Sequence, residues 1–156
     1  MALKLLRGGG LFPLVFVYLL VGLVSCDVRK EKDDKVVIQE FFAHLNKGEY
    51  NKVIGLTDSE AKQLMEHLLN DFPPDVTKLI FPNLVLTSVE YDDFLTKDKK
   101  NLKAYRVKYN LKVDESIQDE DLKKTLKASE KGEALFYLKD GKIRKIVDIQ
   151  GNIFVR

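Results

Sequence analysis

Hydrophobic residues recur at three- and four-residue spacing through the first half of the chain, and this spacing predicts helices. A first helix is expected to begin at Asp33 or Asp34 and to run to Lys47, where Gly48 supplies the left-handed residue that often ends a helix. Its inward residues are expected to be Val37, Ile38, Phe41, Phe42 and Leu45. One face of this helix is therefore rich in aromatic rings.

Two further helices are expected before the pattern changes. A short helix covers residues 49–56, and a longer one opens on a capping box of Thr57 and Glu60 and stops at Pro73. The buried stripe of the longer helix is expected to be Ala61, Leu64, Met65, Leu68, Leu69 and Phe72. The connector at residues 75–83 is assigned no shape.

From Leu84 hydrophobic residues recur at every second position, which predicts strands. One face of the first strand is expected to carry Val85, Thr87, Val89, Tyr91 and Leu95. The second strand is expected to place Tyr105, Val107, Tyr109, Leu111 and Val113 inward and Arg106, Lys108, Asn110 and Lys112 outward. This alternation is typical of an antiparallel sheet with one face in water.

The remainder of the chain predicts a hairpin after a charged excursion. The excursion covers residues 114–131 and contains a brief helix at 121–128. Asp140-Gly141 indicates a two-residue turn between the strands 133–139 and 142–149. Gly151 indicates a bend before a last short strand at 152–155.

The N-terminal segment has a different pattern. After Lys4 and Arg7, a charge-free and mostly apolar run ends in Leu23-Val24-Ser25-Cys26, and a highly charged stretch, 27–34, follows. A transmembrane helix is the alternative, but three glycines, a proline and an apolar part of signal-peptide length favour a cleaved signal. Both interpretations attach the chain to a membrane.

Composition limits the remaining possibilities. Without residues 1–25 the chain holds 24 basic and 24 acidic residues, so its net charge gives no reason to expect nucleic acid as a partner. Cys26 is the only cysteine, so no internal disulfide can form, and it lacks companions for a zinc site. The sequence therefore predicts one domain, with no cofactor and no metal.

Two resemblances follow from these motifs. Leu23-Val24-Ser25-Cys26 resembles the lipobox of bacterial lipoproteins, which implies cleavage between Ser25 and Cys26 and a lipid on Cys26. The stretch VVIQEFFAHLNKGEYNKVIGL, with the strands from Leu84 onward, resembles the NTF2-like superfamily and its small lipoproteins of the DUF4878 type. The resemblance implies an α+β fold in which the helices pack in a curved antiparallel sheet that forms a half-open, cystatin-like cone.

These resemblances divide the chain into a signal peptide at 1–25, a charged tether at 26–34 and an NTF2-like domain at 35–156. Related enzymes carry acid and base groups inside the cone, but no catalytic residue is assigned here, and His44 and His67 are interpreted as boundary histidines. His67 has no acidic partner evident from spacing. Residues expected to line the cone are Phe41, His44, Tyr91, Tyr105, Tyr109 and Tyr137.

The leading hypothesis is a lipid-anchored protein of the bacterial cell envelope whose domain lies outside the cytoplasm. Its non-catalytic cone is expected to bind a small apolar ligand or an envelope protein. An isomerase or hydrolase acting in the cone, and a purely structural module, are the alternatives. An enzyme needs a buried acid and base in a pocket, a ligand binder needs an open apolar pocket, and a structural module needs neither.

Overall fold

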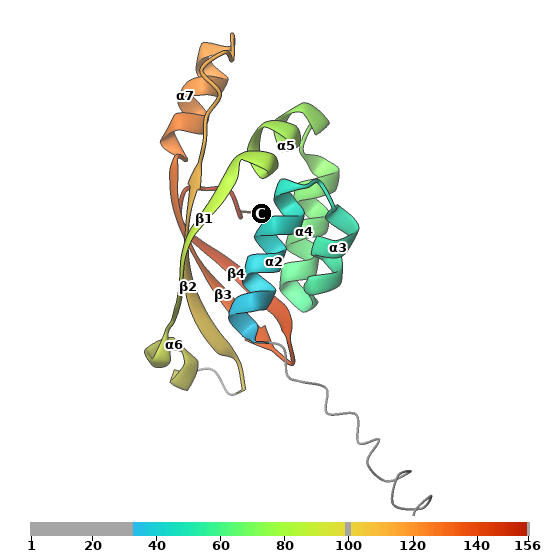
Figure 1. Cartoon of the computed structure of the whole chain (residues 1–156), viewed down its shortest axis with the longest axis vertical. Helices are drawn as coiled ribbons and strands as arrows, with labels where there is room; N and C mark the ends of the chain where they lie inside the picture. Colours follow the sequence, from blue (N-terminus) through green and yellow to red (C-terminus); the bar gives the residue numbers. More distant parts are fainter. Residues whose placement is uncertain (1–32, 99–100, 156) are drawn as a thin grey trace, which may run out of the picture. The chain divides into compact units, whose positions relative to one another are not determined.

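The computed structural model describes residues 33–98 and 101–155, and these form an α+β domain. The signal peptide, Ser25, Cys26 and most of the tether lie outside the described residues. Four antiparallel strands form one sheet in the order β1-β2-β3-β4 (Figure 1). The strands are β1 (Leu84–Tyr91), β2 (Lys103–Leu111), β3 (Lys131–Lys139) and β4 (Lys142–Gln150).

Helices cover one face of the sheet. α2 lies against that face, with α3 and α4 beside it, and α4 also packs along β4 (Figure 1). The helices of the described residues are α2 (Asp34–Asn46), α3 (Tyr50–Leu56), α4 (Ser59–Asp71), α5 (Pro74–Ile80), α6 (Asp93–Asp98) and α7 (Glu120–Ala128), with a 3-10 turn, η1 (Phe81–Asn83). None of them is long and apolar enough to cross a membrane.

The first helix forms as the sequence predicts. Asp33 is its N-cap, and the carboxylate of Asp33 accepts a hydrogen bond from the amide of Lys35 at 3.0 Å. Gly48 has a φ of +69°, the left-handed conformation expected after the helix. The five inward residues predicted for this helix are all buried.

The start of α4 differs from the prediction. Asp58, not Thr57, is the N-cap, and its carboxylate accepts from the amide of Ser59 at 2.6 Å. Thr57 instead ends α3 and pairs with Ile143 of β4 through an isolated bridge. Because this pairing holds Thr57 beside β4, the hydroxyl of Thr57 donates back to the carbonyl of Ile54 at 3.0 Å and no capping box forms.

The two prolines after α4 have separate roles. Pro73 restricts the residue before it to extended backbone, so Phe72 leaves the helix and its ring is 36% exposed, contrary to the predicted burial. Pro74 then occupies the first turn of α5, a position at which a missing N–H costs nothing. The connector is therefore helical.

A β-bulge in β1 reverses the predicted inward face in the first half of the strand and leaves Val89 inward, as predicted. The register shifts between Leu86 and Ser88, so Leu84 and Leu86 face the helices before the bulge and Val89 faces them after it. Val85 and Thr87 are exposed, contrary to the prediction, because one extra residue exchanges the two faces of a strand. Leu95, expected to extend the strand, lies in α6.

The second half of the sheet follows the sequence pattern more closely. β2 buries four of its five predicted inward residues, whereas Val113 lies beyond the end of the strand and is partly buried. Asp140 and Gly141 have positive φ values of 52° and 67°, as the hairpin requires. α7 forms within the charged excursion. The expected last strand does not form, because the amides of Asn152, Ile153 and Phe154 donate to the carboxylate of Asp148 instead of a neighbouring strand.

The close approach of Gly132 to Tyr109 generates a stability prediction. A Cβ atom at position 132 would lie 2.1 Å from the Tyr109 ring, so Gly132→Ala must displace this packed ring. We expect Gly132→Ala to lower the free energy of unfolding by about 1–3 kcal/mol, measured by urea unfolding. The control Gly55→Ala, on a helix position with open space around it, should be neutral or stabilise by about 0.5–1 kcal/mol. Equal stability of the two variants would contradict the prediction.

Candidate functional site

The space between α2 and the sheet is filled by aromatic rings. Phe41 and Phe42 of α2 pack against Tyr109, Phe136 and Phe154, with ring centroids 5.4 to 6.2 Å apart. Each of these five residues is at most 2% exposed. Two of the residues predicted to line a cone, Phe41 and Tyr109, therefore belong to a packed core. We call these five residues the aromatic cluster.

The carboxylate of Asp148 binds two members of the aromatic cluster, Tyr109 and Phe154. It accepts from the Tyr109 hydroxyl at 3.1 Å and from the amides of Ile153 and Phe154 at 3.1 and 3.0 Å. Burial, followed by the charge of Asp148, raises the pKa of Tyr109. Asp148 therefore holds residues 152–154 in place, and the ring of Phe154 is positioned in the aromatic cluster as a result.

A second tyrosine–aspartate pair lies where α2 begins. The Tyr105 hydroxyl donates to Asp34 Oδ2 at 3.2 Å, and Lys103 Nζ lies 3.0 Å from the same oxygen. Asp34 is only 5% exposed, and its place in the first turn of α2 suits a negative charge. The ring of Tyr91 packs edge-on against Tyr105 at 5.5 Å. We call Asp34, Tyr105 and Lys103 the Asp34 cluster.

The Asp34 cluster borders an open cleft of about 390 Å³. The cleft is lined by Asp34, Thr96, Asn101, Leu102, Lys103, Leu138, Lys139 and Asp140. A second cleft of about 430 Å³ lies at the other end of α2, where Asn46, Gly48 and Tyr50 contribute to its wall. Both clefts contain polar and charged side chains, and neither opens into the aromatic cluster.

The chemistry available to the Asp34 cluster is limited. Burial, followed by the charge of Asp34, raises the pKa of Tyr105, so its phenol stays protonated at neutral pH. The phenol is a hydrogen-bond donor and cannot act as a base in this state. Asp34 already accepts from both neighbours, so the arrangement ties the start of α2 to β2.

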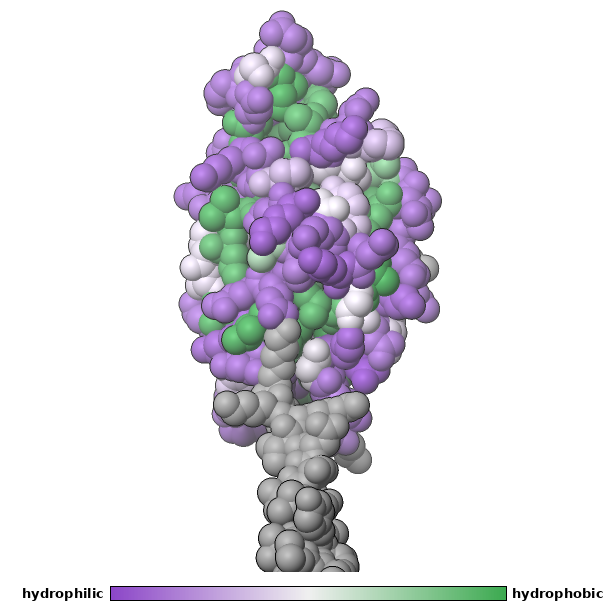
Figure 2. Space-filling view, turned by 45° about the vertical axis from the view of Figure 1, so that its right-hand side comes forward, coloured by the Kyte–Doolittle hydropathy of each residue, from purple (hydrophilic) through white to green (hydrophobic). Residues whose placement is uncertain are grey.

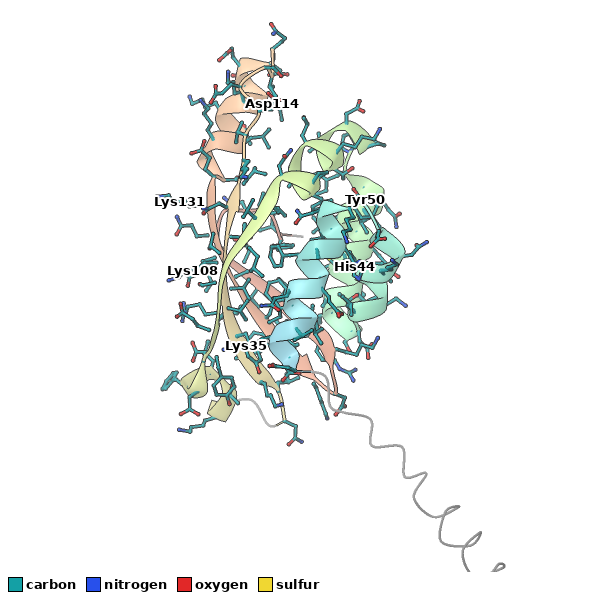
Figure 3. All side chains as sticks on the ribbon, viewed as in Figure 1. Lys35, His44, Tyr50, Lys108, Asp114 and Lys131 are labelled. Carbon is teal, nitrogen blue, oxygen red and sulfur yellow. The ribbon has the colours of Figure 1, made fainter. Side chains whose placement is uncertain are left out.

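The histidines lie away from both tyrosine–aspartate pairs. His44 Nδ1 is 2.5 Å from Glu49 Oε2, and Glu49 also contacts Lys52 at 2.8 Å. Lys52, followed by His44, lowers the pKa of Glu49. His67 contacts the carboxylate of Asp71 four residues later, so the expectation that it has no acidic partner is wrong. Figure 3 shows His44 on the helical side of the domain and not between α2 and the sheet.

Two more of the predicted cone residues lie elsewhere. Tyr137 is 4% exposed but stands beside Ala104 on the face of the sheet turned away from α2, because it alternates with the inward Phe136. The prediction that Tyr137 lines a cone is therefore wrong. Tyr91 is 46% exposed, so it lies at the edge of the domain and not in its interior.

The face that carries Tyr137 is largely charged. Arg106 contacts Asp92 at 3.2 Å and also contacts Glu133, and these bonds raise the pKa of Arg106. Lys108 and Lys131 project from this face away from the helices (Figure 3). Within residues 33–98 and 101–155, no group of three His, Cys, Asp or Glu side chains could hold a metal ion.

Sequence reasoning missed Asp34 and Asp148 as structural centres. Asp34 was interpreted only as a helix cap, and its partner Tyr105 is 71 residues away. Asp148 faces Ala134 and the core although its neighbours in the sequence suggest a half-exposed strand. The sequence gives one indication of this role, which is that Asp148 stands three residues before Gly151, where a bend is expected.

Comparisons of the chain with protein-family models, curated proteins and solved structures found no match. The resemblance to the NTF2-like superfamily therefore rests on the residues quoted above. The fold and the site are interpreted from their own geometry.

The two tyrosine–aspartate pairs predict a loss of stability at alkaline pH. The pKa values of Tyr105 and Tyr109 are higher in the folded chain than their ordinary value of about 10, so the unfolded chain releases these protons first. The stabilisation is complete below pH 10 and should decline as the pH rises above it. Urea unfolding at a series of pH values measures this decline.

Variants assign the alkaline effect to particular residues. Tyr105→Phe should show a shallower decline above pH 10 than the unmodified chain, because one of the two titrating groups is gone. Tyr50→Phe, at a ring that packs on Phe81, is the control and should keep the full slope. Identical slopes in all three proteins would show that Tyr105 has no raised pKa.

Proposed function

We propose that the chain is a lipoprotein of the bacterial cell envelope, attached to a membrane through Cys26, with a domain of the NTF2-like type. The domain binds another envelope protein and is not catalytic. The N-terminal pattern supports the attachment: Lys4 and Arg7, then an apolar run, then Leu23-Val24-Ser25-Cys26, then charged residues. The order of three or more helices followed by an antiparallel meander is consistent with the NTF2-like resemblance.

The aromatic cluster is the observation that carries the binding part of the proposal. A small apolar ligand needs an open apolar pocket, and the rings of Phe41, Phe136 and Phe154 occupy the place where a cone would hold one. A protein partner needs only the surface. Figure 2 shows apolar and hydrophilic residues interspersed over the helical side of the domain. Interfaces between proteins contain both kinds of residue, so this surface is compatible with a protein partner.

The Asp34 cluster favours the enzyme as the second candidate. It combines a buried carboxylate, a phenol with a raised pKa and a lysine beside a cleft of about 390 Å³. An isomerase or hydrolase would need one of these groups free to exchange a proton. The carboxylate and the phenol bind each other, which makes this candidate the weaker of the two.

Replacement of the cysteine tests the attachment. Cys26→Ala should abolish incorporation of a labelled fatty acid and move the protein from the membrane fraction to the soluble fraction, because the lipid would be bound to the Cys26 thiol. Val28→Ala, two residues later, is the control and should stay labelled and membrane-bound. Continued labelling of Cys26→Ala would overturn the lipoprotein proposal.

Native mass spectrometry tests the choice between a protein partner and a small ligand. The protein purified from its own host in mild detergent should have the mass of the lipidated chain alone or of a complex with another protein. The reason is that the filled aromatic cluster leaves no space for a retained apolar molecule. A stoichiometric small molecule released on unfolding would contradict protein binding and restore the ligand-binding cone.

A further inference from the structure

The domain has one end at which the chain enters it. Asp34, the first residue of α2, shares a cleft with Thr96 of α6, Lys103 at the start of β2 and Asp140 in the β3–β4 turn. They come from three separate parts of the sequence, and α6, the start of α2 and the β3–β4 turn lie at the same end of the domain (Figure 1). We call the end that carries Asp33, α6 and the β3–β4 turn the entry end.

Phe94 is the most exposed large hydrophobic residue among the described residues. It lies in the first turn of α6 at the entry end and is 81% exposed, whereas the other exposed apolar residues, Tyr91 included, are at most 49% exposed. Among the described residues, Phe94 takes no part in the ring contacts that join the aromatic cluster, Tyr50 with Phe81, and Tyr91 with Tyr105. Most of the apolar surface of the Phe94 side chain is therefore in contact with water, and burying it against an apolar partner would be favourable.

Three carboxylates at the entry end are in ion pairs. Asp93 pairs with Lys97 at 2.5 Å, Asp92 pairs with Arg106 at 3.2 Å and Asp34 pairs with Lys103 at 3.0 Å. An unpaired charge next to a low-dielectric surface is costly, and a charge that already has a partner is less so. The entry end therefore combines an exposed aromatic ring with three acids that have cationic partners.

The length of the tether limits where this end can be. Seven peptide units separate Cys26 from Asp33, and such a chain spans at most ~25 Å when fully extended. If Cys26 carries a lipid in the bilayer, as proposed above, the entry end stays within that distance of the membrane surface. The opposite end of the domain carries α7 and α5, which begins two residues after the exposed Phe72, and it is under no such limit (Figure 1).

From these observations we propose that Phe94 inserts into the membrane to which Cys26 is attached, so that the domain lies with its entry end against the lipid surface. This inference rests on the proposed lipid anchor and adds an orientation to it. The anchor supplies the attachment, and Phe94 supplies a second contact that orients the domain. The ion pairs of Asp34, Asp92 and Asp93 lower the cost of that approach.

The absence of tryptophan from the chain permits a direct test. Phe94→Trp in the full lipidated chain places a single fluorescent ring at the contact, and Phe72→Trp places one at another exposed phenylalanine as the matched control. Each variant is reconstituted in vesicles of phosphatidylcholine and phosphatidylglycerol, with and without bromine on the acyl chains. Circular dichroism and urea unfolding check that both variants keep the fold.

Two measurements test the lipid anchor and the membrane contact of Phe94 separately. Co-flotation with vesicles reports the anchor, and quenching by brominated lipid reports the contact. We expect both variants to float, and only Phe94→Trp to shift its emission to shorter wavelength and lose most of its fluorescence to bromine. Flotation of both with equal, weak quenching would overturn the membrane contact and leave the anchor intact. Failure of both to float would overturn the anchor, and with it the inference.

Discussion

The packing of α2 against the sheet is the interaction on which the rest of the domain depends. Phe41 and Phe42 meet Phe136 from β3 and Phe154 from beyond β4, so one pair of neighbouring residues contacts parts of the chain 94 to 113 residues away. A buried aromatic residue contributes about 1.5–3 kcal/mol through burial alone, and edge-on ring pairs add to this. Loss of this packing would leave the sheet with one uncovered apolar face.

Two tyrosine–aspartate pairs secure this packing at its two ends. Tyr105 and Tyr109 lie four residues apart on the same face of β2, and they bind Asp34 at the start of α2 and Asp148 near the end of β4. Each pair gives a buried phenol a carboxylate partner, and the phenol hydroxyl would be costly to bury without one. The polar groups of the two pairs therefore have a structural use.

Local patterns predicted the elements but not the connections between them. The aromatic spacing of α2, the alternation of β2 and the Asp140-Gly141 turn are properties of neighbouring residues, and the structure confirms all three. The bulge at Thr87 leaves no trace in an alternating pattern, since it is set by the pairing of β1 with β2. Asp34 and Asp148 could not be assigned their roles, because their tyrosine partners are 71 and 39 residues away.

The position of Phe154 in the sequence has a consequence for the order of folding. Its ring is part of the aromatic cluster and its amide is bound by Asp148, yet it follows every helix and strand of the domain. The aromatic cluster therefore closes late in folding, because the ring of Phe154 can join Phe41 and Phe42 only after the long chain between them has been brought together.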